Sequence, residues 1–343
     1  MDFLFVQFLN GLASASSLFL VASGLSIIFG VTRIVNFAHG AFYMIGAYLA
    51  FTLTQQFAGP FGYYGGMVAA AVCVALLGAL VETTLLRRIY EAPELFQLLA
   101  TFGLTLMVED LVVMIWGPED LLGARAPRLE GAVDIFGQKF PAYDFLLIGL
   151  GPLVLGLLWL LFHKTRWGIL VRAATQDRAM VSALGVNQAW LFTSVFTLGI
   201  FLAGLGGAVQ IPREAVHHTM DLTIIVEAFV VVVIGGLGSV PGAFLAAIII
   251  SELNAFGILL FPKISLVLVF LVMAIVLVVR PWGLLGRPDA HPRPPIGNVL
   301  IPFRRFSAAG RNGAIALVVL VALLPVVVGN YGLAVAAEIL IFG

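Results

Sequence analysis

Charged residues are scarce in this chain: Asp, Glu, Lys and Arg make up only 10% of its 343 residues, whereas 61% are hydrophobic. The mean hydropathy is +1.09. A soluble domain of this length cannot bury so much apolar surface, so the composition excludes a soluble globular protein. The chain is therefore expected to cross a membrane several times.

Other absences exclude several kinds of chemistry. The single cysteine, Cys73, lies in an apolar run, which leaves neither a disulfide framework nor a thiol metal site. The spans contain no paired metal ligands and no nucleophile–base spacing, so an intramembrane enzyme is disfavoured. Glu214, His217 and His218 fall in a wet outside loop, where a metal site is not expected. We therefore predict no catalytic residues, no cofactor, no metal and no nucleic-acid partner.

Apolar stretches of roughly 17 to 25 residues are long enough to cross a bilayer. Marking them along the chain predicts eight to ten crossings. The fold class is then an all-α, polytopic transmembrane helical bundle, with broken or re-entrant helices at the glycine-rich points. The expected spans lie near 5–30, 40–57, 64–86, 97–116, 143–162, 190–210, 223–238, 241–260, 264–279 and 314–340.

The charges between these spans are unevenly distributed. With connections assigned to alternate sides, one side receives Arg33, Arg87–Arg88, 163–189 and 280–312, which together hold 13 of the 18 Lys and Arg residues. The positive-inside rule makes that side cytoplasmic. The longest loop on the other side, 117–142, has Pro and Gly breaks around two short β-prone pieces, which predict a small hairpin.

The segment NFAHGAFYMIGAYLA, residues 36–50, begins with a polar cluster and continues as a helix rich in small residues. Small side chains such as Gly40 and Gly46 let helices approach closely in lipid. Asn36 and His39, three residues apart, share one helix face and need polar partners or a wet cavity. One interpretation is a broken helix beside a transport path. The other is that both residues cap the helix and hydrogen-bond a neighbouring span.

Five acidic residues lie within or at the edges of the expected spans, where an acidic side chain near the bilayer centre costs about 2.5–3.5 kcal/mol. Glu82, Glu109 and Asp110 lie near span ends, so we expect them to reach the membrane interface. Glu227 and Glu252 lie deeper, and they are better candidates for a polar pathway or an interhelical contact.

A second glycine-rich break is IGGLGSVPGAF, residues 234–244. Its glycines and Pro241 cannot continue a regular helix at low cost. The segment lacks the Lys-Ser/Thr ending of a phosphate-binding loop. We interpret it as a tight turn between helices, with a direct role in gating as the alternative.

Residues 165–187 form the longest polar and basic interruption of the apolar pattern. Within it, 176–184 favours a short helix, with Thr175 as N-cap, Asp177 in its first turn and Gly185 as its stop. Such a helix either docks in a groove of a soluble partner or lies on lipid headgroups. Its apolar face is formed by Ala179, Met180, Ala183 and Leu184.

Four motifs in order, NFAHGAFYMIGAY, TRWGILVRAATQDRAMVSALGVN, VVVVIGGLGSVPGAF and RPWGLLGR, closely resemble the permease subunits of bacterial branched-chain amino acid ABC importers. The resemblance runs from about Asn10 to Arg287. It implies a multi-pass subunit of the bacterial inner membrane that pairs with a second permease. It also implies contacts with cytoplasmic ABC ATPase subunits, a periplasmic substrate-binding protein and membrane lipid.

In that family, the loop that matches 165–187 carries the coupling helix that meets the ATPase. The resemblance therefore assigns the ATPase contact to Arg172, Asp177, Ala179, Leu184 and Gly185. It assigns the translocation region to Asn36, Phe37, His39 and Gly40, to which we add Glu227 and Glu252 as deep acidic residues.

The sequence departs from that pattern at its end. The permease region, 1–287, is followed by a basic Pro-rich linker, 288–312, and by a further hydrophobic span, 313–343, that resembles the start of a sister permease. One hypothesis is a truncated fusion of two permeases, and the alternative is a natural extra helix.

The resemblance implies import of amino acids, branched-chain ones above all, by alternating access driven by ATP hydrolysis on partner proteins. Relatives that import urea, amides or carboxylates leave the substrate open, because a separate binding protein selects it. A different class also stays open: an ion-coupled secondary transporter with His39, Glu227 and Glu252 as a relay. Dependence on a separate ATPase distinguishes the two.

Overall fold

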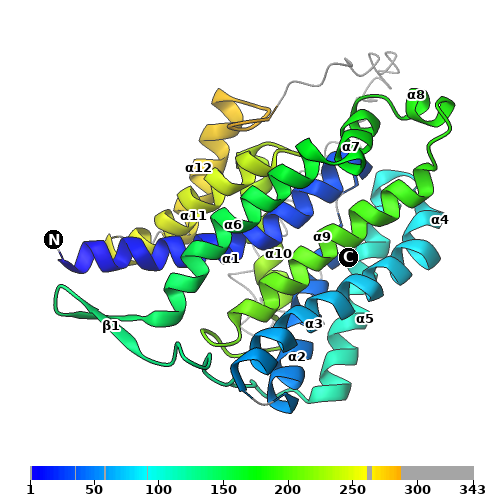
Figure 1. Cartoon of the computed structure of the whole chain (residues 1–343). Coiled ribbons are helices and arrows are strands. Elements are labelled where there is room, and N and C mark those ends of the chain that lie inside the picture. The colour runs from blue at the N-terminus through cyan, green and yellow to red at the C-terminus, as the bar shows by residue number, and fades with distance from the viewer. Residues whose placement is uncertain (1, 35, 58, 91, 261–264, 287–343) are drawn as a thin grey trace, which may run out of the picture. The chain divides into compact units, whose positions relative to one another are not determined.

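The computed structural model describes residues 2–34, 36–57, 59–90, 92–260 and 265–286. Its helices form one bundle around α1, Asp2–Thr32, which lies against α9, Gln188–Gln210, and α11, Val240–Leu260 (Figure 1). The bundle is completed by α2, Ala38–Gln56; α3, Gly59–Val81; the π-helical turn η1, Glu82–Leu86; α4, Arg87–Ile89; α5, Glu94–Trp116; α6, Ala142–Lys164; α7, Arg166–Gln176; α8, Arg178–Ala183; α10, Met220–Gly235; and α12, Ser265–Val279.

The apolar runs of the sequence correspond to these helices. Each of the nine stretches expected before residue 280 overlaps one of them, and the tenth, 314–340, lies outside the described residues, as do the linker 288–312 and the segment 313–343. Within the described part of the chain, six helices are long and apolar enough to span a membrane. That number is lower than the expected eight to ten, partly because the 16 residues of α10 rise only about 24 Å.

Burial separates a central helix from peripheral ones. In the most apolar 18-residue window of α1, 83% of residues are buried, against 22% in α5 and in α6. Apolar side chains that a soluble protein would hide are exposed along α5, among them Leu95, Met107 and Met114. Because lipid tails solvate such side chains, α1 lies inside the bundle while α5 and α6 present apolar faces suited to a membrane.

Small residues set the closest helix crossings, as the sequence predicts for α2. A Cβ atom on Gly46 would lie 2.4 Å from the carbonyl oxygen of Gly204 in α9, and one on Gly24 in α1 would lie 2.3 Å from that of Gly199. Backbone contacts of this kind replace the hydrophobic drive that is missing between helices in lipid. They hold α1 and α2 against the same helix, α9.

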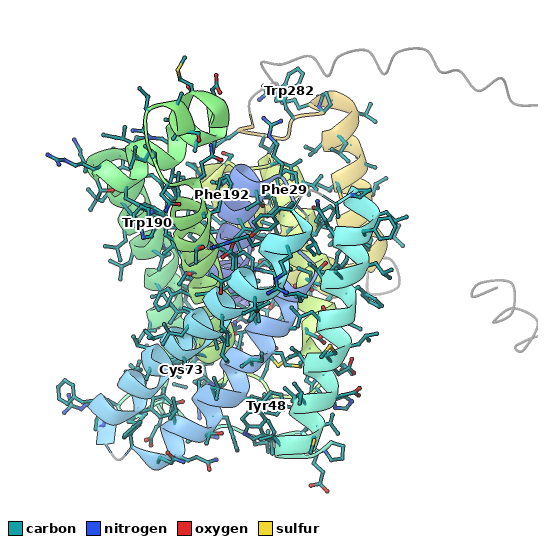
Figure 2. The ribbon with its side chains drawn as sticks, turned by 90° about the vertical axis from the view of Figure 1, so that its right-hand side faces the viewer. Phe29, Tyr48, Cys73, Trp190, Phe192 and Trp282 are labelled. Carbon is teal, nitrogen blue, oxygen red and sulfur yellow. The ribbon has the colours of Figure 1, made fainter. Side chains whose placement is uncertain are left out.

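The connections lie at two ends of the bundle. One end, here called the basic end, contains the C-terminal end of α1, α4, α7, α8 and the turn at 280–286 (Figures 1 and 2). Arg33 follows α1 directly, and its backbone donates to Phe29. The other, here called the hairpin end, contains the expected hairpin: β1, Ala132–Ile135, pairs antiparallel with β2, Gln138–Pro141. The Tyr63 hydroxyl donates to the carbonyl of Ala124 at 2.8 Å and fixes the loop that leads to the hairpin.

The glycine-rich break at 234–244 is a tight turn between α10 and α11, as predicted. The sequence did not reveal which segment packs against this turn. In the structure, the turn after α12 forms backbone hydrogen bonds with it. The backbone N–H of Leu284 donates to Ile234 at 2.8 Å, and that of Leu285 donates to Gly235 at 3.0 Å. Gly236, with φ +104°, leaves no room for a side chain, since a Cβ there would lie 2.4 Å from the nitrogen of Gly286.

Candidate functional site at the basic end

The predicted coupling segment forms two helices at the basic end. The first, α7, is capped by Thr165, whose hydroxyl accepts from the backbone of Gly168 at 3.0 Å. Its residues Val171 and Ala174 are buried, while the Trp167 indole donates to the Ser194 hydroxyl of α9 at 2.8 Å. These contacts fasten α7 to the bundle, and α8 follows directly.

The second helix, α8, begins later than the sequence predicts. Asp177 is its N-cap and accepts from the backbone of Met180 at 2.9 Å. The prediction of Thr175 as N-cap is wrong, because that residue belongs to α7 and its hydroxyl donates back to Arg172. Asp177 suits the N-cap because its backbone is extended, with φ −146° and ψ 101°, as an N-cap residue requires, whereas Thr175 is helical. Gly185, with φ +83°, ends the segment as expected.

The surface of α8 combines a buried anchor with exposed apolar side chains. Val181 is only 4% exposed and packs on the chain's own core, whereas Met180 and Leu184 are 59% and 75% exposed. Arg172 is exposed on the preceding helix, and the side chain of Ala179 lies outside the described structure. Exposed apolar side chains at a polar end of the bundle form a surface suited to a protein partner.

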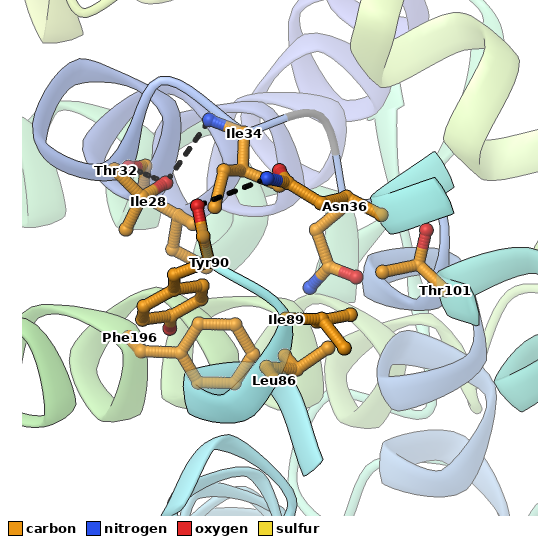
Figure 3. A pocket seen from close by; sticks show the side chains of 10 residues that line it. Ile28, Thr32, Ile34, Asn36, Leu86, Ile89, Tyr90, Thr101 and Phe196 are labelled. Carbon is orange, nitrogen blue, oxygen red and sulfur yellow. Dashed lines mark hydrogen bonds between the residues drawn. The ribbon is translucent and has the colours of Figure 1, made fainter. Parts of the chain in front are cut away.

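The Asn36 segment lies beside this end and borders a small pocket, here called the Asn36 pocket (Figure 3). The Asn36 side-chain oxygen accepts from the backbone of Ala38, the first residue of α2, at 3.1 Å. Its amide nitrogen is buried and has no hydrogen-bond partner among the described residues. Polar lining comes from Thr32, Asn36, Tyr90, Gln97 and Thr101.

The other residues of this motif fix α2 to its neighbours. The Phe37 backbone lies 3.4 Å from the hydroxyl of Thr101 in α5. The fully buried His39 contacts the carbonyl of Val21 in α1 through Nε2 at 2.9 Å. A Cβ on Gly40 would lie 2.3 Å from the carbonyl of Asp221, at the start of α10. His39 and Gly40 therefore pack α2 against α1 and α10, while Asn36 lies at the edge of a pocket.

The deep acidic residues do not meet one another. Glu252 packs its carboxylate against Gly11 of α1, and its oxygens are buried without a hydrogen-bond partner within the described residues. His39 contacts the same helix at Val21, ten residues or about 15 Å further along. Glu227 is half-buried in α10. No described hydrogen bond connects these three residues into a relay.

Glu82 is buried inside the protein, although the sequence predicted that its side chain would reach the membrane interface. Its side chain is 0% exposed and forms an ion pair with Arg87, with Oε2 at 3.1 Å from Nη2. The hydroxyl of Thr193 in α9 donates to the same carboxylate at 2.7 Å, and that of Tyr90 at 3.2 Å. The prediction was wrong because the carboxylate obtains its partners inside the protein and does not need the interface.

A second charged pair was also missed by sequence reasoning. At the hairpin end, Arg213 Nε lies 3.2 Å from the carboxylate of Asp144, which is 3% exposed. The partners are far apart in sequence, and each lies at a helix end where charges are common. The available signal was that both residues border apolar spans, which requires each of them to find a partner or water.

The sequence belongs to a known family. Residues 7–277 match the family described as the permease component of the branched-chain amino acid transport system. Because this match covers well over half of the chain, the chain is a member of that family, as the four motifs indicated. It is a multi-pass membrane subunit with a transport role, and it is not an enzyme.

Curated relatives agree with this assignment. The chain is 27% identical to the high-affinity branched-chain amino acid transport system permease protein BraD of Pseudomonas aeruginosa, over 83% of this chain and 96% of that protein. It is 26% identical to the Escherichia coli permease protein LivH, with the same coverage. The Escherichia coli permease protein LivM is 26% identical, over 76% of this chain and 66% of LivM. No solved structure matches the chain significantly.

Proposed function

We propose that this chain is a permease subunit of an ATP-driven ABC importer, and that α8 delivers the motion of a cytoplasmic ATPase to the bundle. The observation that carries the proposal is the form of α8: Met180 and Leu184 are exposed, while Val181 and the neighbouring helices anchor it. A helix held in this way can receive a partner on one side and shift the bundle on the other.

The family supports the remaining parts of the assembly that we propose. A second permease subunit completes the pathway, and a periplasmic binding protein supplies the substrate at the hairpin end. The excess of Lys and Arg at the basic end supports an orientation in which that end faces the cytoplasm and the bundle spans the bacterial inner membrane. Translocation then occurs by alternating access, with Asn36, Phe37, His39 and Gly40 near the inner end of the pathway and Glu227 and Glu252 deeper.

The substrates we propose are amino acids, with the branched-chain ones first. Support comes from the family and from relatives that are named for branched-chain amino acid transport. Uptake of labelled leucine, in competition with valine, alanine, urea and a short-chain amide, tests this proposal. Competition by urea or the amide, and not by valine, would contradict it.

The coupling role is tested by placing charge on α8. Leu184→Arg, and Ala179→Arg beside it, should weaken ATPase binding because an arginine cannot be buried unpaired in an apolar contact. The full chain is tagged and purified gently from its membrane, and the ATPase that accompanies it is quantified.

Leu122→Arg is the matched control. Leu122 is 80% exposed but lies in the loop that bridges to Val216 at the hairpin end. We expect this variant to retain the ATPase. Equal recovery of ATPase by Leu184→Arg and by the unmodified chain would remove α8 from the mechanism. Leucine uptake that persists in cells without any ABC ATPase would favour an ion-coupled carrier.

A further inference from the structure

Glu82 is the best-satisfied buried charge in the described part of the chain. Its carboxylate receives Nη2 of Arg87 at 3.1 Å, the hydroxyl of Thr193 at 2.7 Å and the hydroxyl of Tyr90 at 3.2 Å. Arg87 also donates to the Thr193 hydroxyl. A buried carboxylate with this many partners holds them strongly, because any partner that leaves exposes the charge to an apolar interior.

A local change of helix type makes the cluster possible. In an α-helix, residues five apart point about 140° away from each other, so Glu82 and Arg87 would not meet. Residues 82–86 form a π-helical turn instead, and the Arg87 backbone donates to the carbonyl of Glu82, five residues earlier. Such turns occur often at functional sites. This one places the guanidinium on the carboxylate.

One side of the cluster leads to α8. Thr193 lies on α9 six residues after Asn187, the cap of that helix, whose side chain accepts from the backbone of Trp190. Only the short turn around Gly185 separates this cap from α8. The adjacent Ser194 accepts from Trp167 of α7. The first turns of α9 are therefore tied to both helices of the coupling segment.

The other side of the cluster leads to the Asn36 pocket. Tyr90 lines that pocket, as do Leu86 and Ile89 from the same short stretch (Figure 3). The carbonyl of Tyr90 accepts from the side chain of Gln97, which also lines the pocket. A displacement of the 82–90 stretch therefore changes one wall of the pocket.

We propose that Glu82 is a positioning residue that links the start of α9 to the pocket wall formed by 82–90, so that motion received at α8 moves this wall. The inference rests on the proposed ABC importer function. Glu82 contacts no substrate in this mechanism. Its carboxylate makes α9 and the 82–90 stretch move together, since separating them would leave the charge buried with fewer partners.

Thr193→Val tests the link with the smallest change. Valine keeps the shape of threonine but lacks the hydroxyl. Glu82 therefore retains its contacts with Arg87 and Tyr90 but loses its hydrogen bond to α9. The full importer, with its ATPases, second permease and binding protein, is reconstituted in proteoliposomes. ATP hydrolysis and the uptake of labelled leucine are measured together. We expect the ATP hydrolysed per leucine to rise about tenfold, the size of a typical coupling between sites.

Two further variants separate positioning from simple folding support. Thr193→Ser restores the hydroxyl and should return the ratio to that of the unmodified chain. Thr52→Val removes a comparable hydroxyl, which accepts from Trp116 of α5 at 2.9 Å near the opposite end, and should leave the ratio unchanged. An unchanged ratio in Thr193→Val, or an equal rise in Thr52→Val, would overturn the role of Glu82.

The outcome also distinguishes this inference from the function on which it rests. Absence of ATP-dependent uptake by the unmodified importer would refute the importer function and, with it, the role of Glu82. ATP-dependent uptake by the unmodified importer, together with a normal ratio in Thr193→Val, would refute the role of Glu82 alone.

Discussion

The crossing of α2 and α10 at Gly40 supports a quantitative prediction. A Cβ atom added to Gly40 would lie 2.3 Å from the carbonyl oxygen of Asp221 and 3.0 Å from Cβ of Ile225. Real Cβ atoms keep at least 3.0 Å from their neighbours, so the helices must separate by at least 0.7 Å, the difference between 3.0 and 2.3 Å. The nearest obstructing atom is the backbone oxygen of Asp221, which cannot move aside as the end of a flexible side chain could.

The expected cost follows from this geometry. Forcing one extra methyl group into a packed contact costs about 1–3 kcal/mol. At about 2–4 °C per kcal/mol, Gly40→Ala should lower the melting temperature of the purified chain by roughly 2 to 12 °C. Thermal unfolding in a mild detergent, followed by tryptophan fluorescence, measures the shift.

Gly103→Ala provides the matched control. Gly103 lies within the helix α5, and an added Cβ would meet nothing within 4 Å. Alanine at such a position favours the helix by about 0.5–1 kcal/mol, so this variant should melt at the same temperature or slightly higher. If Gly40→Ala melted as high as Gly103→Ala, the close contact between α2 and α10 would be refuted.

Three further substitutions test separate parts of the structure. Asp177→Ala removes the cap of α8 and should cost that helix about 1 kcal/mol, seen as faster amide hydrogen exchange there and unchanged exchange in α6. Asp144→Ala leaves Arg213 without its carboxylate and should cost about 3 kcal/mol, which a lower melting temperature would reveal; an unchanged value would contradict the ion pair. Tyr63→Phe removes the hydrogen bond to Ala124 and should speed protease cleavage of the loop at 117–131, whereas equal cleavage rates would contradict that contact.

Several features of the fold were predictable from local sequence. Apolar length alone located the spans, because the bilayer imposes its thickness on every helix that crosses it. The hairpin at 132–141 and the turn at 236–239 were predictable because glycine permits backbone conformations that other residues rarely adopt and proline fixes its own φ. The surface of α8 was foreseen in outline, although its cap lies two residues after Thr175.

The candidate site was less predictable. Asn36 and His39 were recognised as polar residues in an apolar context, but their partners, Ala38 and Val21, could not be read from the sequence. Glu82 was assigned to the interface because it lies near a span end. Its partners could not be read from the sequence, because a π-helical turn brings Glu82 and Arg87, five residues apart, together.

The sequence by itself determined where this protein is apolar, where its backbone must turn and which end carries the positive charge, because each of these depends on neighbouring residues. The tertiary structure alone decided which buried groups meet: Glu82 with Thr193, Arg213 with Asp144, and the turn after α12 with Gly235. Those pairs join segments up to 111 residues apart and depend on how helices cross. No local pattern in the sequence encodes which residues meet across such distances.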